Sequence, residues 1–167
     1  VMKALVPSLD TCFVASRSPA SEKEFVECIG SLCRDVEIVP CAGDWERAAR
    51  DADIVVTAIS GQTPLLKAEW IKQGTFYCHV GGWEDEFEVA FKADKIVCDS
   101  WEAVKHRAQT ISRMYKQGLL RDSDVYADLA DILSGAKLGR ESAEEFIYFD
   151  SVGLAFTDIA LASALYD

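Results

Sequence analysis

Short apolar segments that end in small or polar residues constrain the fold of this chain more than any other feature. The clearest is Asp53–Ile59, whose nearly continuous apolar character is typical of a strand in a parallel sheet covered on both faces. Segments of the same kind recur along the chain, at Thr11–Ser16, Val36–Val39, Thr75–Val80, Lys95–Asp99 and Phe146–Phe149. The sequence therefore predicts a sheet built from short, buried strands.

Helix signals separate these strands. Ser18-Pro19 starts a helix with proline in its first turn, which we expect to reach about Ile29, and Asp44 is a candidate N-cap for a helix at Trp45–Arg50. We also expect a helix end at Val1–Leu5 and helices at Lys67–Ile71, Glu102–Gly118, Asp124–Ser134 and Leu154–Tyr166. This alternation predicts the α/β class, with a doubly wound, mostly parallel, Rossmann-like sheet.

Several predicted strands end in a step of small residues. Open α/β sheets bind ligands at the carboxyl ends of their strands, and small residues there let a cofactor approach the backbone. The steps are Ser16-Arg17-Ser18, Thr57-Ala58, Gly81-Gly82 and Ser151-Val152-Gly153. We therefore expect a cofactor site along this edge; a plain strand end or turn is the alternative at each step.

Arg17 indicates which cofactor such a site would prefer. In a dinucleotide-binding βαβ unit, the end of the second strand lies beside the adenosine ribose, where an acid suits NAD and an arginine suits the phosphate of NADP. Ser16, Arg17 and Ser18 are therefore interpreted as a phosphate clamp, which favours NADP(H) over NAD(H). The glycine-rich turn would lie roughly 20 residues upstream. We thus expect this domain to lack the usual first strand and glycine turn.

Composition argues against several other partners. With 17 basic and 28 acidic residues the net charge is −11, so a nucleic-acid-binding face is not expected. No stretch approaches the length of a membrane span. The acidic run Glu84–Glu88 is interpreted as a solvated segment. The six cysteines show neither CxxC nor zinc spacing, which favours reduced, buried thiols in a cytoplasmic protein and no metal site.

The order and spacing of several motifs resemble the ornithine cyclodeaminase/mu-crystallin family. The motifs are Ala52-Asp53-Ile54-Val55-Val56-Thr57-Ala58, Trp70-Ile71-Lys72-Gln73-Gly74-Thr75, Val80-Gly81-Gly82, Asp124-Val125-Tyr126-Ala127-Asp128-Leu129 and Phe149-Asp150-Ser151-Val152-Gly153. The resemblance implies an NAD(P)-dependent oxidoreductase whose subunits pair as homodimers. It also implies that residues 1–167 are the partial dinucleotide-binding domain, without the family's substrate and dimerisation domain, and that this piece alone is inactive or nearly so.

The same resemblance assigns roles to strand ends. Thr57, Ala58 and Ile59 would lie beneath the cofactor's ribose and pyrophosphate, and Val80 and Gly81 near its nicotinamide. At Ser151-Val152-Gly153, exposed backbone N–H groups of Ser151 and Gly153 would hold a carboxamide or carboxylate.

Two positions depart from the family pattern. Trp83 stands where the cyclodeaminase branch has an aspartate, and Asp150 stands where a lysine is usual. Because Trp cannot exchange a proton at a useful pKa, we favour hydride transfer to or from an α-imino or α-amino acid. An ornithine cyclodeaminase-type ammonia lyase and an NADP-dependent small-ligand-binding protein remain the alternatives. No catalytic residue is assigned; His79 is interpreted as a hydrogen-bonded core residue, with an acid–base role as the alternative.

Overall fold

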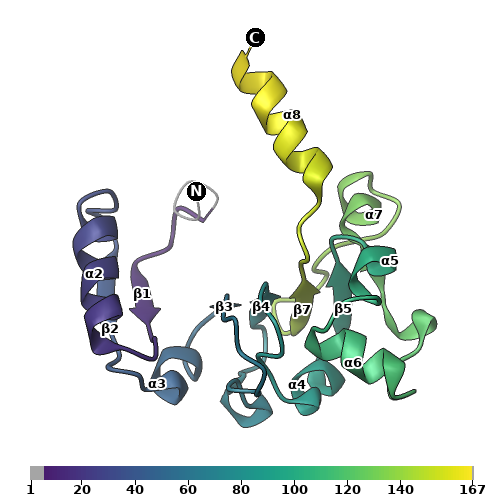
Figure 1. The fold of residues 1–167 in the computed structure, drawn as a ribbon, viewed down its shortest axis with the longest axis horizontal. Coiled ribbons are helices and arrows are strands. Elements are labelled where there is room, and N and C mark those ends of the chain that lie inside the picture. Colours follow the sequence, from purple (N-terminus) through teal and green to yellow (C-terminus); the bar gives the residue numbers. More distant parts are fainter. Residues whose placement is uncertain (1–5, 167) are drawn as a thin grey trace. The chain divides into compact units, whose positions relative to one another are not determined.

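The computed structural model describes residues 6–166, and the chain divides into two compact units, Val1–Ala52 and Asp53–Asp167, each with its own parallel sheet (Figure 1). The helix end predicted at Val1–Leu5 lies outside the described residues. Parallel pairing throughout both sheets confirms the predicted α/β class.

The first unit is a single βαβ motif followed by a short helix. Strand β1 (Thr11–Val14) pairs in parallel with β2 (Glu37–Pro40), and helix α2 (Pro19–Gly30) makes the connection between them. Pro19 opens α2, as expected. Asp44 caps α3 (Trp45–Ala49) by accepting a hydrogen bond from the backbone N–H of Arg47 at 2.9 Å.

The second unit holds a five-stranded sheet in the order β3-β4-β7-β5-β6, in which every neighbouring pair is parallel. The strand β7 comes last in sequence yet lies between β4 and β5 (Figure 1). The strands are β3 (Ile54–Thr57), β4 (Phe76–His79), β5 (Lys95–Cys98), β6 (Ala127–Asp128) and β7 (Ile147–Asp150). Their register pairs Thr57 with His79 and His79 with Asp150, so these residues form one row at the carboxyl edge.

The helix predicted over Glu102–Gly118 is interrupted. Two helices form instead, α5 (Trp101–Val104) and α6 (Thr110–Lys116). Gln109 precedes α6 in an extended conformation and donates its side-chain N–H to the carbonyl of Ser151 at 3.1 Å. The Ser112 hydroxyl donates to the carbonyl of Val104 at 2.6 Å, so a side chain of α6 binds the end of α5. Tertiary hydrogen bonds thus replace the continuous helix.

The helix predicted over Asp124–Ser134 is also shorter than expected. The backbone N–H of Tyr126 donates to the carbonyl of Ile96 at 2.8 Å, and β6 then pairs with β5. Only Leu129–Leu133 remains helical, as α7, and Asp128 and Asp131 form a capping box at its start. Pairing with the sheet edge overrides the helical pattern. The remaining elements of this unit are the 3₁₀ turns η1 (Ala68–Trp70) and η2 (Asp122–Asp124) and the helices α4 (Phe87–Lys92) and α8 (Ala155–Tyr166).

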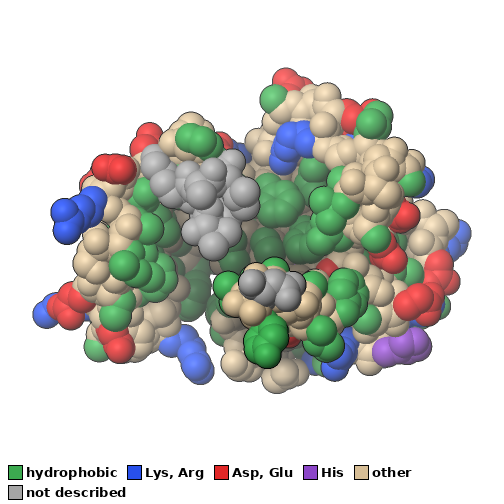
Figure 2. All heavy atoms as spheres, turned by 90° about the horizontal axis from the view of Figure 1, so that it is seen from above, with side chains coloured by type: hydrophobic (Ala, Val, Ile, Leu, Met, Phe, Trp, Pro, Cys, Tyr) green, Lys and Arg blue, Asp and Glu red, His purple; other side chains and the backbone are tan. Residues whose placement is uncertain are grey.

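The last helix, α8, stands away from the sheet of its own unit, and all its residues are exposed (Figure 1). Figure 2 looks onto the tip of α8, where hydrophobic side chains surround the helix end. Its exposed apolar residues include Phe156, Ile159, Leu161 and Leu165. A helix that is apolar on all sides is normally covered by other protein. Within residues 6–166 no helix combines the length and apolar character needed to cross a bilayer.

Candidate functional site

The carboxyl edge of the second unit brings together most of the residues predicted to contact a cofactor. Thr57 and His79 end adjacent strands, and Asp150 ends the next one. The segments that follow these three strands carry Ala58, Ile59, Val80, Gly81, Ser151 and Gly153. Ser16, Arg17 and Ser18 follow β1 in the first unit. Each segment is held by a buried carboxylate, and none of these carboxylates was among the predicted site residues.

In the first unit, Glu22 holds the ends of both strands. Its carboxylate accepts hydrogen bonds from the backbone N–H groups of Ser16 (2.8 Å), Ala42 (2.6 Å) and Gly43 (2.8 Å). The side chain is buried, and these donors, that of Ser16 above all, keep the pKa of Glu22 below its usual value. Because Glu22 is buried and already binds three backbone N–H groups, its carboxylate is not exposed to a ribose hydroxyl.

Arg17 and Ser18 leave their polar groups available. Arg17 is exposed, and among residues 6–166 its guanidinium makes no hydrogen bond or ion pair. Ser18 is the N-cap residue of α2 but makes no side-chain capping bond. The Ser16 hydroxyl instead shapes the turn, since it donates to the carbonyl of Ser18 at 2.7 Å. Two of the three clamp residues therefore have the free donors that the prediction requires.

In the second unit, the Glu84 carboxylate accepts hydrogen bonds from residues at the ends of both β3 and β4. One oxygen accepts from the Thr57 hydroxyl (2.6 Å) and from the backbone N–H of Gly81 (2.9 Å), and the other accepts from the backbone N–H of Ile59. Glu84 is buried, so the prediction of a solvated acidic run is wrong here. The Thr57 hydroxyl is already engaged and is not a free donor.

Only glycine fits at position 81, because of the close contact with Glu84. A Cβ added at Gly81 would overlap the Glu84 carboxylate and the backbone carbonyl of Ile59. At Gly82 an added Cβ would come within 2.6 Å of the backbone carbonyl of Gly61. The glycine pair is thus required by close packing of two loops of the chain itself.

Asp99 holds the segment after β7. One carboxylate oxygen accepts from the Ser151 hydroxyl (3.1 Å) and from the backbone N–H groups of Val152 (2.9 Å) and Gly153 (2.8 Å). The N–H of Ser151 donates to the carbonyl of His79 at 2.9 Å. The expectation that these N–H groups are free to hold a carboxamide or carboxylate is therefore wrong, because Asp99 and His79 already occupy them.

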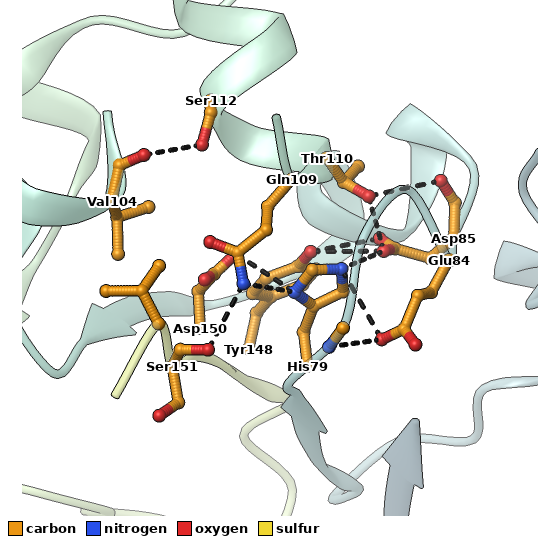
Figure 3. Close-up of polar contacts among 12 residues, drawn as sticks. His79, Glu84, Asp85, Val104, Gln109, Thr110, Ser112, Tyr148, Asp150 and Ser151 are labelled. Atoms are coloured by element: carbon orange, nitrogen blue, oxygen red, sulfur yellow. Dashed lines mark hydrogen bonds and ion pairs between the residues drawn. The ribbon is translucent and has the colours of Figure 1, made fainter. Parts of the chain in front are cut away.

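Beneath this edge lies a buried cluster of His79, Glu84, Asp85 and Asp150 (Figure 3). His79 Nδ1 lies 3.2 Å from Asp150, and Nε2 lies 3.5 Å from Asp85 and 3.6 Å from Glu84. Burial lowers the pKa of His79, but the three carboxylates, led by Asp150, outweigh it and the net shift is upward. His79 is therefore a buried core residue whose protonated form is favoured by the surrounding carboxylates.

Asp85 is the carboxylate of this cluster with the most hydroxyl donors. It accepts from Thr110 (2.6 Å) and Tyr77 (3.2 Å), and both its oxygens accept from Tyr148 (3.1 and 3.2 Å). Burial raises its pKa to about 6 despite the nearby His79. Burial also raises the pKa of Asp150. The cluster thus retains protons that exposed carboxyls would lose.

Trp83 packs against Phe87 and Arg113. Its ring lies 6.2 Å from that of Phe87, and the Arg113 guanidinium lies 4.8 Å above it. The neighbouring acids, Glu84 and Asp85, turn into the core and are saturated by donors of the chain. Neither acid therefore takes the place of the aspartate that the cyclodeaminase branch has at the position of Trp83.

The described part of the chain contains no cluster of His, Cys, Asp and Glu suited to a metal ion. All six cysteines are free. Cys41 and Cys98 are buried, whereas Cys28 is exposed, so the expectation of buried thiols is wrong for Cys28.

Sequence reasoning missed the three supporting carboxylates for different reasons. Asp99 is the last residue of a predicted strand, and that position was a usable signal. Glu84 was hidden in a run of acids. Glu22 lies in a helix among exposed residues, and nothing local marks it as buried.

The parallel sheets and their crossover connections define a Rossmann-type α/β fold. The sequence model of the ornithine cyclodeaminase/mu-crystallin family matches residues 1–167, and the chain belongs to that family.

Individual relatives agree with this assignment. The chain is 37% identical over 150 residues to an alanine dehydrogenase of Archaeoglobus fulgidus, covering 87% of this chain and 44% of the relative. A solved Thermococcus litoralis Δ1-pyrroline-2-carboxylate reductase, in complex with NADH and L-proline, superposes with a TM-score of 0.86 at 31% identity, covering 92% of this chain and 48% of that one. An archaeal alanine dehydrogenase dimer with bound NAD gives 0.85 at 32%, covering 94% and 48%. The chain thus spans about half the length of these relatives.

Proposed function

We propose that this chain is the dinucleotide-binding domain of an NAD(P)-dependent oxidoreductase that transfers hydride to or from an α-imino or α-amino acid. One observation carries the proposal. Over 92% of its length the chain superposes on a reductase solved with NADH and L-proline, to which it is 31% identical in sequence.

The residues at this edge suit a nicotinamide dinucleotide. Ala58 and Val80 follow adjacent strands and are exposed, so they offer small apolar surface to a ribose or nicotinamide ring. Glu84 fixes both loops without presenting its own charge to the solvent. When bound, the cofactor supplies the hydride chemistry, and these residues orient it and exclude water.

A preference for NADP(H) is the finer part of the proposal. The free guanidinium of Arg17 and the uncapped hydroxyl of Ser18 are the donors that a ribose phosphate needs. Glu22, a buried acid of the same unit, binds three backbone N–H groups and is not exposed to a ribose hydroxyl. The solved relatives hold NAD or NADH, so this preference would distinguish the present chain from them.

Substrate binding would require protein beyond these residues. We propose a second domain that contributes substrate contacts, and a homodimer in the cytoplasm. The exposed apolar helix α8 supports contact with other protein, since Phe156, Ile159 and Leu165 have no cover within their own unit.

The test is to titrate the intact protein with NADPH and NADH, and then to assay it with cyclic and linear α-imino acids. We expect saturable binding of both dinucleotides, tighter for NADPH, and oxidation of the reduced cofactor when an imine is added. Binding of neither dinucleotide would refute the proposal. Tight NADPH binding without turnover would favour a ligand-binding protein, and ammonia release from ornithine without net cofactor consumption would favour a cyclodeaminase.

A further inference from the structure

The Glu84 carboxylate accepts hydrogen bonds from both loops at the centre of the proposed nucleotide edge. It accepts from Thr57 and Ile59 on the β3 side and from Gly81 on the β4 side. All three donors are residues expected near the ribose, pyrophosphate and nicotinamide. Glu84 itself is buried, so its carboxylate is not open to solvent.

The contact is built tightly. Gly81 has no space for a Cβ because Glu84 and the carbonyl of Ile59 fill it. The N–H of Gly82 donates to the same Ile59 carbonyl at 3.1 Å, so the two loops also meet through their backbones. A change in the Glu84 carboxylate would therefore move both loops at once.

His79 Nε2 lies 3.6 Å from the Glu84 carboxylate, and the carboxylates around His79, led by Asp150, raise the pKa of His79. An ionised carboxylate accepts from all three donors, whereas an amide of the same shape presents an N–H group to one of them. Substitution by Gln would thus leave one buried backbone or hydroxyl donor unpaired.

We propose that Glu84 is a positioning residue for the dinucleotide, which sets the separation of the Thr57–Ile59 and Val80–Gly81 loops without touching the ligand. This inference rests on the proposed function. It assigns Glu84 to the pyrophosphate and nicotinamide part of the site, and so separates its role from that of Arg17 at the phosphate-bearing ribose. Loss of Glu84 should weaken NADH and NADPH equally.

The experiment measures dissociation constants of both dinucleotides for the intact protein and for Glu84→Gln. We expect about tenfold weaker binding of each, as one unpaired donor implies. The matched control is Glu88→Gln, an exposed acid in α4, which should bind like the wild type. Unchanged binding in Glu84→Gln, with the thermal transition well above the assay temperature, would overturn the inference.

A second pair of variants decides the question if Glu84→Gln does not fold. Thr57→Val removes one donor to Glu84 and keeps the branched shape, and Thr57→Ser keeps the hydroxyl. We expect about threefold weaker binding of both dinucleotides in the valine variant and recovery in the serine variant. Equal binding in both variants would overturn the inference. A wild-type protein that binds neither dinucleotide would instead refute the proposed function, before any variant is compared.

Discussion

His79 and Asp150 occupy paired positions on the neighbouring strands β4 and β7, and His79 Nδ1 lies 3.2 Å from the Asp150 carboxylate. Both side chains are fully buried. The acid at position 150, which departs from the family pattern, is thus turned into the core rather than toward a substrate. The paired strands thus place an imidazole and a carboxyl group side by side in the core of the second unit.

Breaking this pair should destabilise the protein. In Asp150→Asn the buried His79 loses its closest carboxylate, so we expect a lower His79 pKa and a loss of about 3 kcal/mol in the free energy of unfolding. The stabilisation that comes from a raised histidine pKa is complete below the unfolded value and disappears as the pH rises through the folded one. The His79 ring resonances, followed by NMR against pH, measure the shift directly. Asp158→Asn, in exposed α8, is the control; the same titration curve in all three proteins would contradict the assignment.

Asp85 predicts a second pH dependence. Burial raises its pKa from 3.8 to about 6, so the native state binds more protons than the unfolded state between these values. The free energy of unfolding should therefore fall as the pH rises through this window. Asp85→Asn removes the titration, so wild type should lose on the order of 2 kcal/mol relative to the variant between pH 4 and pH 7.5. Urea unfolding at the two pH values measures this; a difference that does not vary with pH would contradict it.

Gly81→Ala should be harmful for a steric reason. The new methyl group would overlap the Glu84 carboxylate and a backbone carbonyl, and backbone cannot move as freely as a side-chain end. We expect a loss of about 2 kcal/mol or more in stability together with weaker cofactor binding. Gly30→Ala is the control, since an added Cβ there meets nothing within 4 Å and Gly30 lies in α2. That variant should be neutral or more stable. Thermal melts of both variants test this, and the same transition temperature in Gly81→Ala and Gly30→Ala would rule out the close contact.

Asp99→Ala should loosen the segment after β7. Alanine has no acceptor for the hydrogen bonds that one carboxylate oxygen now takes from Ser151, Val152 and Gly153. We expect a loss of about 1–3 kcal/mol in stability. Hydrogen exchange should show faster exchange at the N–H groups of Val152 and Gly153, and unaltered protection of those two would count against the contact.

Arg17→Ala should change cofactor selectivity alone. If its guanidinium holds the ribose phosphate, removal should weaken NADPH by about tenfold to a hundredfold and leave NADH unchanged. Arg34→Ala, an exposed residue of the same unit, is the control. Titration of each variant with both dinucleotides measures the effect, and an equal loss for NADH and NADPH would exclude a phosphate clamp.

The sequence by itself determined the α/β class, the succession of the principal strands along the chain, and the segments that follow their carboxyl ends. Apolar runs such as Asp53–Ile59 and the step Gly81-Gly82 are local signals, and local signals survive in a single sequence. Family membership followed from the order of such motifs. The interruption of the helix at Lys105–Gln109 could not be predicted from the local sequence, because it depends on a hydrogen bond from the Gln109 side chain to the carbonyl of the distant Ser151.

Only the tertiary structure decided what lies beneath that edge. Glu22, Glu84 and Asp99 look like ordinary acids in the sequence, yet each accepts backbone N–H groups from segments brought to it by the fold. His79 meets Asp150 only because β7, the last strand, enters between β4 and β5. The physical reason is strand register: it places residues far apart in the chain side by side in a dry core, where a carboxylate must find donors or keep its proton.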